Sequence, residues 1–185
     1  MALRLESIRR AHRPLWADFQ NPQTTLVEYL RRYALRHAEK DHLARTWLAI
    51  DEDGGMSRLA GYFSLATVSV ERAAAARLPE LDRLPRFPIP GVLLARLAVD
   101  TRVRGQGLGR YLFEEALGLT LQLAHDGPVA FRLLVTDALD AAAMRFYMHF
   151  GLAPLGEDFP CRMVLDLHPL LAGGAQSAEI RTRTP

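Results

Sequence analysis

The sequence predicts an α/β protein, close to the α+β class, with a mixed central sheet of about six to seven strands flanked by helices. Two observations favour this class. An early helix is followed by a β-meander, and the second half then alternates strand, helix, strand, helix and strand. The 185 residues are 49% hydrophobic and 24% charged, which suits one domain with a sizeable core and excludes a wholly disordered chain.

The first half is expected to contain an edge strand, a helix and a hairpin. The helix is predicted to begin at Asn21-Pro22, because asparagine caps helices and proline is tolerated at their first position. Thr25 and Glu28 offer a capping box slightly later. Helical spacing gives one apolar stripe, formed by Leu26, Tyr29, Leu30, Tyr33 and Ala34. The strands are expected at Leu3–Ile8, Thr46–Ile50 and Leu59–Val70.

The second half is expected to contain three strands and two helices. The strands are predicted at Val92–Val99, Val129–Val135 and Cys161–Leu167. The helices are predicted at Gly109–Ala124, with Leu112, Ala116, Leu119 and Leu123 on the core side, and at Asp140–Phe150, ending at Gly151. Ala73–Pro90 is a long connection of the kind that is usually functional or disordered. We expect one domain over residues 1–171 and a flexible tail over 172–185.

Several classes of protein are excluded by composition. No apolar run approaches the roughly 18–20 residues of a membrane span, and the first residues lack the features of a signal peptide. The single cysteine, Cys161, cannot form an internal disulfide, which suits a reducing cytoplasm, and it is expected to be a strand residue. The sequence offers no cysteine cluster for structural zinc, so no metal is expected.

The basic residues are 22 arginines and one lysine, Lys40. Two interpretations stay open: a genome that prefers arginine codons, and phosphate recognition by guanidinium groups. Position favours the second, because residues 1–50 carry nine basic and five acidic side chains, a surplus of four. Arg32 and Arg36 lie one helical turn apart on one flank of the apolar stripe, and Arg31 lies on the other.

A strand that runs into a glycine-rich turn and then a helix forms the most informative stretch. Leu94–Asp100 is the strand, and Thr101–Gly109 is the turn. Glycines let the backbone approach a ligand closely, and the N–H groups at the start of the helix favour an anion such as a diphosphate. A P-loop is excluded because no lysine follows the glycines, and a dinucleotide fold is excluded by the spacing to the next acidic residue.

These residues resemble the GNAT superfamily of N-acetyltransferases. Arg104-Gly105-Gln106-Gly107-Leu108-Gly109 is similar to the family's Arg/Gln-x-x-Gly-x-Gly/Ala signature. A second family pattern is matched by Asp140, Ala143, Phe146-Tyr147 and Phe150-Gly151, with Asp140 where many members have asparagine and Leu152 where they have phenylalanine. The resemblance covers about residues 45–167. It implies a GNAT fold whose sheet is splayed between the Leu97–Val99 and Val129–Val135 strands, opening a cleft for CoA.

The resemblance also implies acetyl-CoA as cofactor and roles for single residues. Tyr147 would be the catalytic acid that protonates the departing CoA thiolate. The backbone of the Leu97–Val99 strand would bind the pantetheine arm and the acetyl carbonyl. The expected cofactor-binding residues are Leu97, Ala98, Val99, Arg104, Gly105, Gln106, Gly107, Leu108, Gly109, Asp140, Ala143 and Phe146.

A narrower resemblance is to the GNAT toxins of toxin–antitoxin modules, carried by Gly61–Ala66, Pro88-Ile89-Pro90, Leu94–Asp100 and Asp18-Phe19. It implies acetylation of the α-amino group of aminoacyl-tRNA and a ribbon-helix-helix antitoxin as partner. Gln20-Asn21-Pro22 departs from the Asp-Cys-Gly of many such toxins. An enzyme acting on a small amine or protein N-terminus, a CoA-binding sensor without turnover, and a homodimer stay open. The expected tRNA contacts are Arg32, Arg36, Arg77, Arg83, Arg86 and Arg96. Arg9, Arg10 and Arg13 either join them in one tRNA-facing patch or are only solvated surface residues.

No residue is singled out as a general base. The candidates are Glu71, Asp100, Asp137, His125 and His149, and none of them stands out. An α-amine titrates near about 8, so part of it is neutral at pH 7, whereas a lysine amine near about 10.4 needs far more help from a base. The absence of a clear base therefore favours an α-amine as the acceptor.

Overall fold

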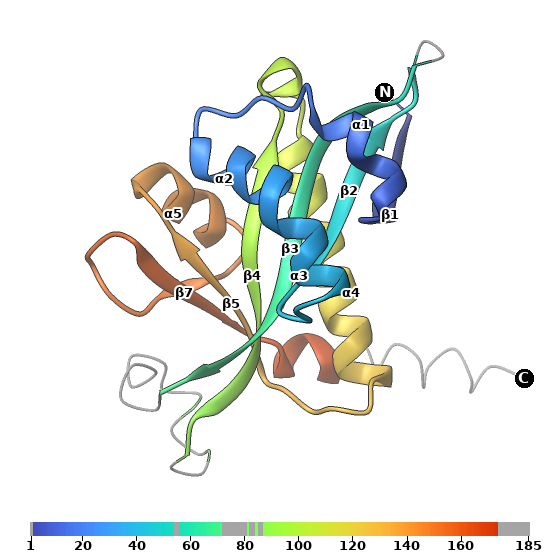
Figure 1. The fold of residues 1–185 in the computed structure, drawn as a ribbon. Helices are drawn as coiled ribbons and strands as arrows, with labels where there is room; N and C mark the ends of the chain where they lie inside the picture. Colours follow the sequence, from blue (N-terminus) through green and yellow to red (C-terminus); the bar gives the residue numbers. More distant parts are fainter. Residues whose placement is uncertain (1, 54–55, 72–80, 82–83, 85–86, 174–185) are drawn as a thin grey trace, which may run out of the picture. The chain divides into compact units, whose positions relative to one another are not determined.

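The computed structural model describes residues 2–53, 56–71, 81, 84 and 87–173. It confirms the predicted class, because helices flank a mixed seven-stranded sheet with the order β1-β2-β3-β4-β5-β7-β6 (Figure 1). The chain divides into two compact units, Met1–Thr67 with Leu94–Ala116, and Val68–Leu93 with Leu117–Pro185. The long strands β3 and β4 and the helix α4 each contribute to both units.

The first unit contains an antiparallel sheet. β1 (Leu3–Ser7), β2 (Arg45–Asp51) and β3 (Arg58–Val70) pair in sequence order, and β4 (Ile89–Val99) follows β3 in the sheet. β1 confirms the predicted edge strand, and it runs opposite β2 from Leu3 against Asp51 to Ser7 against Trp47. The sheet therefore positions the carboxyl end of β4, where the glycine-rich turn begins.

The N-terminal helices differ from the single predicted helix. A 3-10 turn η1 (Arg10–His12) and α1 (Arg13–Trp16) come first, and α2 (Thr24–Glu28), the π-helix η2 (Tyr29–Ala34) and α3 (Leu35–Glu39) follow. The predicted start at Asn21-Pro22 is wrong, because the Asn21 side chain donates to the Val99 carbonyl (2.9 Å) instead of capping a helix. The Thr25–Glu28 capping box is also wrong, since Gln23 is the N-cap and makes no side-chain cap bond.

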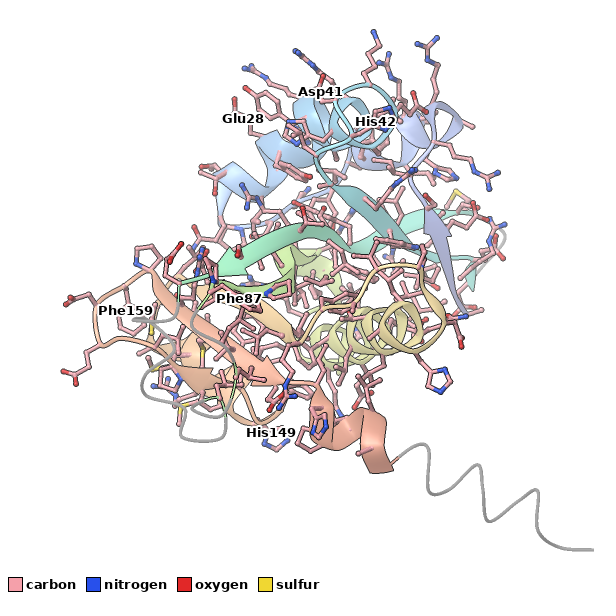
Figure 2. The ribbon with its side chains drawn as sticks, turned by 90° about the horizontal axis from the view of Figure 1, so that it is seen from below. Glu28, Asp41, His42, Phe87, His149 and Phe159 are labelled. Atoms are coloured by element: carbon pink, nitrogen blue, oxygen red, sulfur yellow. The ribbon has the colours of Figure 1, made fainter. Side chains whose placement is uncertain are left out.

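The core of the first unit lies between these helices and one face of the strands. Tyr29, Leu30 and Ala34 are buried there in one cluster with Leu48 and Tyr62. Figures 1 and 2 show these helices on one face of the first unit's strands and the start of α4 on the other.

Tyr33, placed on the buried stripe by α-helical spacing, is 42% exposed. The π-helix explains the error, because each of its residues turns through a smaller angle than an α-helical residue does. Of the stripe residues after Tyr29, Tyr33 leaves the buried face, whereas Leu30 and Ala34 stay on it.

The second unit contains β5 (Leu133–Ala138), α5 (Ala141–Met148), β6 (Ala153–Pro154) and β7 (Cys161–Asp166), and α4 (Leu108–Asp126) ends in it. β5 and β7 are antiparallel, and their cluster of buried residues includes Leu133 and Val164. Cys161 is buried in β7, as the sequence predicts.

Two sequence expectations for this region are wrong. Val129 is predicted to begin the strand, but it lies outside β5 and is 66% exposed, because β5 begins only at Leu133. Leu123 of α4 is 47% exposed, whereas Thr120 is fully buried. The buried face of α4 therefore follows Leu112, Ala116 and Thr120, which are spaced four residues apart, rather than turning toward Leu123.

Within the described ranges, no helix has the length and apolar character needed to cross a membrane. No group of histidine, cysteine, aspartate or glutamate residues suited to a metal ion occurs in that part of the chain either. Most of the Ala73–Pro90 connection, together with its Arg77, Arg83 and Arg86, and the tail after residue 173 lie outside the described residues.

Arg31 and Arg32 form a matched pair for a stability test. Arg31 donates to the carbonyls of Trp16, Ala17 and Phe19, whereas Arg32 makes an exposed ion pair with Glu28. We expect Arg31→Ala to lower the free energy of unfolding by about 1–3 kcal/mol, because three acceptors lose a charged donor, and Arg32→Ala by less than about 0.5 kcal/mol. Urea denaturation measures both. Equal losses of stability in the two variants would show that the three hydrogen bonds from Arg31 to carbonyl oxygens do not stabilise the fold.

Candidate functional site

The glycine-rich turn links β4 to α4 in the first unit. After the 3-10 turn η6 (Thr101–Val103), Arg104 to Gly107 are exposed, and buried Leu108 begins α4. Gly105 and Gly107 have φ angles of +76° and +81°, and a Cβ atom at either position would meet nothing within 4 Å. These positions therefore need glycine for the backbone itself. The space above them is open, and the N-terminus of a 19-residue helix adjoins it.

Asp100 holds this turn in place. Its carboxylate is 1% exposed and accepts from the backbone N–H of Gln20 (3.0 Å) and of Arg102 (2.9 Å), and from the Arg102 guanidinium (2.8 Å). Arg102 also donates to the Asp18 carbonyl (3.0 Å). Burial alone would raise the pKa of Asp100, but the hydrogen bonds from Arg102 and Gln20 outweigh it and lower this pKa. Asp100 is therefore a charged anchor rather than a base.

Backbone groups at the end of β4, the strand before the turn, already have hydrogen-bond partners. Ala98 is buried in the core of the first unit, whereas Leu97 and Val99 are half-buried. The Val99 carbonyl accepts from Asn21, and the Asp100 N–H donates to the Ala60 carbonyl (2.8 Å). The end of β4 is thus tied both to β3 and to the N-terminal segment.

Arg96, the polar residue of this strand, lies over an aromatic ring. Its guanidinium carbon is 4.9 Å from the centre of the Tyr29 ring, which is a cation–π contact, and its side chain is exposed. No carboxylate among the described residues pairs with Arg96. A guanidinium that is held in place without a carboxylate partner can accept an anion.

The second signature lies in the second unit. Asp140 caps α5 by accepting a hydrogen bond from the Ala143 N–H (2.8 Å). The asparagine that many family members have at this position could accept the same bond through its amide oxygen. The Phe146 ring meets the Tyr147 ring edge-on at 5.1 Å. Tyr147 is 8% exposed, and its burial raises the pKa of the phenol, while a hydrogen bond with the Thr136 side chain opposes this shift. Tyr147 is therefore a protonated phenol near pH 7.

Four of the candidate bases are engaged elsewhere. Asp100 bonds Arg102, Asp137 accepts two bonds from Arg162 at 2.9 Å, His125 is exposed beside Asp126, and His149 packs against Phe150. Glu71 is exposed at the end of the described part of its segment.

A basic groove of about 420 Å³ lies among the N-terminal helices of the first unit. Arg36 and Arg32 line it, as their shared flank in the sequence suggested, but Arg36 pairs with Asp41 (2.9 Å) and Arg32 with Glu28 (3.1 Å). Figure 2 shows Glu28 and Asp41 on the outer side of these helices. The lining residues are Arg10, Arg13, Trp16, Arg31, Arg32, Leu35, Arg36, Glu39, Lys40 and Asp41.

Sequence reasoning grouped Arg10 and Arg13 with Arg32 and Arg36 as a possible tRNA-facing patch, but it missed the groove and the contribution of Lys40. The signal was the basic surplus of residues 1–50, but a charge count does not bring Arg10 and Arg13 of one segment next to Lys40 of another. Six cationic side chains face two carboxylates in the lining. Such a surplus in a concave surface attracts a polyanion.

An α/β sheet with an open glycine-rich turn at a helix N-terminus, and a buried phenol on a separate helix, suits a transferase that uses a phosphorylated acyl carrier. Residues 6–152 match the acetyltransferase (GNAT) family. The chain belongs to this family. It is an N-acetyltransferase, and acetyl-CoA is its cofactor.

Relatives and solved structures support the family assignment. A protein of Mycobacterium tuberculosis described as a tRNA-acetylating toxin is 34% identical over 133 residues, which are 72% of this chain and 75% of that protein. A tyrosine-to-phenylalanine mutant of KacT matches with a TM-score of 0.81 and 23% identity, over 91% of this chain and 97% of that one. AtaT complexed with acetyl-methionyl-tRNAfMet matches with a TM-score of 0.79 and 22% identity, over the same shares. These two likenesses show the fold.

Gly107→Val tests the turn. Its left-handed backbone disfavours a branched side chain, and that side chain would fill the open space above the turn. We expect acetyl-CoA binding to be abolished in calorimetry. Gly118→Ala is the control, because Gly118 of α4 also has nothing within 4 Å but lies in a regular helix, and it should leave binding unchanged. Unchanged affinity in Gly107→Val would remove the turn from the cofactor site.

Asp100→Asn tests the anchor through pH. A carboxylate whose folded pKa is lowered stabilises the fold above its unfolded pKa, and this contribution is lost as the pH falls through the folded value. We expect the variant to be less stable than wild type by about 1–3 kcal/mol at pH 7, with the difference shrinking below about pH 4. Denaturation curves across this range measure it. A difference that is independent of pH would contradict the charged anchor.

Proposed function

We propose that this chain is a toxin that acetylates the α-amino group of aminoacyl-tRNA and thereby stops translation. The observation that carries the proposal is the basic groove, which lies in the same unit as the glycine-rich turn. A small amine gives an enzyme no reason to build a groove with six cations, whereas a nucleic acid does. The 34% identical relative described as a tRNA-acetylating toxin points to the same substrate.

The cofactor is held by residues of both signatures. The diphosphate lies over Arg104, Gly105, Gln106, Gly107, Leu108 and Gly109, with the backbone of Leu97, Ala98 and Val99 beside the pantetheine arm. Three further residues contribute to the cofactor site by holding α5 and Tyr147 in position. Asp140 and Ala143 form the first turn of α5, and Phe146 packs on Tyr147. The open space above Gly105 and Gly107 supports this placement.

The reaction is direct transfer. The neutral amine attacks the carbonyl carbon of the thioester, the carbon–sulfur bond breaks, and Tyr147 gives its proton to the departing sulfur. Burial keeps this phenol protonated until the thiolate leaves. An α-amine with a pKa near about 8 is partly neutral at pH 7 and can attack without a dedicated base. The engagement of four of the candidate bases elsewhere fits this acceptor.

The proposed tRNA contacts fall into four groups. Arg10, Arg13 and Lys40 line the groove without a carboxylate partner among the described residues, so they are free to bind phosphates. Arg32 and Arg36 would have to exchange their exposed ion pairs for phosphates. Arg96 would meet the substrate on β4. Arg77, Arg83 and Arg86 keep their proposed role without structural support, because they lie outside the described residues.

An antitoxin is the second proposed partner. Solved structures similar to this chain include AtaT bound to the C-terminus of the antitoxin AtaR, with a TM-score of 0.73, and a KacTA–DNA complex with the same score. We expect a ribbon-helix-helix protein to be encoded beside this chain and to neutralise it. A cytoplasmic location, where charged tRNA is found, belongs to the same proposal.

Mass spectrometry of charged tRNA tests the acceptor. The protein is incubated with acetyl-CoA and a full elongator set, and the nuclease digest is searched for acetylated aminoacyl adenosine. We expect this product with at least one tRNA. Robust acetylation of small amines or peptides with every charged tRNA left untouched would overturn the proposal in favour of a small-amine enzyme. Binding of acetyl-CoA without any turnover would favour a sensor.

Tyr147→Phe should keep the affinity for acetyl-CoA and lower turnover by about 10²–10⁴-fold, the usual range for a general acid. The ring still packs on Phe146, so only the proton donor is lost. Calorimetry and the rate of CoA release measure the two effects. Turnover within about threefold of wild type would leave Tyr147 with a packing role alone.

Arg10→Ala with Arg13→Ala should weaken the use of tRNA and leave acetyl-CoA binding unchanged. Each lost phosphate contact should reduce the slope of log affinity against log salt by about 0.7–0.9. Arg110→Ala is the control, because Arg110 is an exposed arginine of α4 paired with Glu114 outside the groove. An unchanged slope in the double variant would place the RNA elsewhere.

A further inference from the structure

Tyr33 is a large aromatic side chain that the core of the first unit does not use. It is 42% exposed, although α-helical spacing would place it on the buried stripe, and it lies in the π-helix η2. π-helical turns inside α-helices are frequent at functional sites. Its sequence neighbour Arg32 lines the basic groove. An exposed ring beside a basic surface suits a ligand that has both flat faces and negative charge.

The Tyr33 ring is the outer end of a continuous row of side chains in the first unit. Its centre lies 5.8 Å from that of the His37 ring, and His37 meets Tyr29 edge-on at 5.6 Å. At the other end, the Arg96 guanidinium carbon is 4.9 Å from the centre of the Tyr29 ring. We call Tyr33, His37, Tyr29 and Arg96 the aromatic row. All four residues belong to the first unit, so printed contacts join the row from end to end.

The inner part of the aromatic row is fixed by the core. Tyr29 is 7% exposed, and its ring stacks on that of Tyr62 in β3 at 6.4 Å. The Tyr62 hydroxyl donates to the Leu26 carbonyl (2.7 Å), which ties this pair of rings to α2. The Tyr29 hydroxyl has no hydrogen-bond partner among the described residues, so the position contributes a ring rather than a polar contact. The row is therefore preformed, which lowers the entropic cost of binding a ligand.

Positive charge lies at both ends of the aromatic row. Arg96 donates to the adjacent Ala95 carbonyl (2.6 Å), and no carboxylate in the described part of the chain pairs with it, so its other N–H groups can bind a phosphate. At the Tyr33 end, Arg32 and Arg36 of the same helical segment line the basic groove. Figure 1 shows this segment, from α2 to α3, lying over β3 and β4.

A single-stranded RNA end has the chemistry that such a row recognises. Its unstacked bases present flat faces, which stack on aromatic side chains and on guanidinium planes, and its phosphates bind arginine. A duplex hides the faces of its bases, and a small amine has neither feature. The amino acid of a charged tRNA is attached to a single-stranded 3′ end, so this ligand is consistent with the proposed function.

We propose that the aromatic row binds the single-stranded 3′ end of the RNA substrate, with a base stacked on Tyr33 and a phosphate bound by Arg96. The inference rests on the proposed function and adds a binding site to it. Arg96 lies on β4, the strand that leads to the glycine-rich turn. The row therefore guides the 3′ end toward the cofactor, while the basic groove binds phosphates elsewhere on the same RNA.

Binding of a short single-stranded RNA tests the row without acetyl transfer. The probe ends in CCA and carries a fluorescent purine analogue as its last base. We expect Tyr33→Ala to weaken binding by about five- to a hundredfold, the effect of losing one base–aromatic stack. Tyr33→Phe should stay within about threefold of wild type, because a phenyl ring also stacks. Phe159→Ala is the control, since Phe159 is a comparably exposed aromatic residue (45%) of the second unit (Figure 2).

Salt dependence separates stacking from charge. Stacking releases no counterion, so Tyr33→Ala should leave the slope of log affinity against log salt unchanged. Arg96→Ala should reduce this slope by about 0.7, the value for one phosphate contact on a single strand. In turnover, Tyr33→Ala should raise the KM for charged tRNA and leave the KM for acetyl-CoA unchanged.

Four results would overturn the inference. They are a wild type that does not bind the probe, a Tyr33→Ala variant that binds as tightly as wild type, a Tyr33→Phe variant as weak as Tyr33→Ala, and an equal loss in Phe159→Ala. The proposed function fails separately, because it requires acetylation of charged tRNA and the probe does not. If Tyr33 is needed for probe binding but every charged tRNA stays untouched, only the acceptor proposal is overturned. Acetylated charged tRNA with no effect of Tyr33→Ala overturns only this inference.

Discussion

The hydrogen bonds accepted by Asp100 are the constraint on which the geometry of the first unit depends. One buried carboxylate holds the Gln20 backbone, the Arg102 backbone and the Arg102 guanidinium, and Arg102 reaches on to the Asp18 carbonyl. The end of β4, the start of the glycine-rich turn and the segment before α2 are thereby fixed at one point. Several donors suit this position, because a buried carboxylate keeps its charge only when hydrogen bonds offset the cost of its burial.

The sequence predicted the parts of the site that depend on local chemistry. Gly105 and Gly107 lie in an open turn before a helix, as expected, and α5 follows Asp140 within the predicted range. The errors arise where a distant partner decides. Asn21 looks like a cap but bonds Val99, 78 positions away in the chain. The sequence suggested a patch that includes Arg10 and Arg13, but no short pattern reports that Lys40 comes next to them in a groove.

Arginines of similar appearance in the sequence have different roles in the fold. Arg31 binds three carbonyls and belongs to the structure, whereas neighbouring Arg32 pairs with Glu28 on the surface. Arg96 lies over the Tyr29 ring without a carboxylate partner among the described residues. An arginine-rich composition therefore says little about function until the partner of each guanidinium is known. The groups that lack a carboxylate partner are the ones free to recognise a phosphate.

The π-helix η2 restricts how the length of this segment can change during evolution. A π-turn contains one residue more than the α-helical turn it replaces, so it behaves as a tolerated single-residue insertion. Deleting one residue between Tyr29 and Ala34 would return the segment to α-helical spacing and leave the later side chains of α3 facing the same way, because the wider turn absorbs the extra residue. Homologues that lack the extra residue would consequently keep the same α3 side chains toward the groove, and aligning them without a gap in η2 would pair residues that are not equivalent.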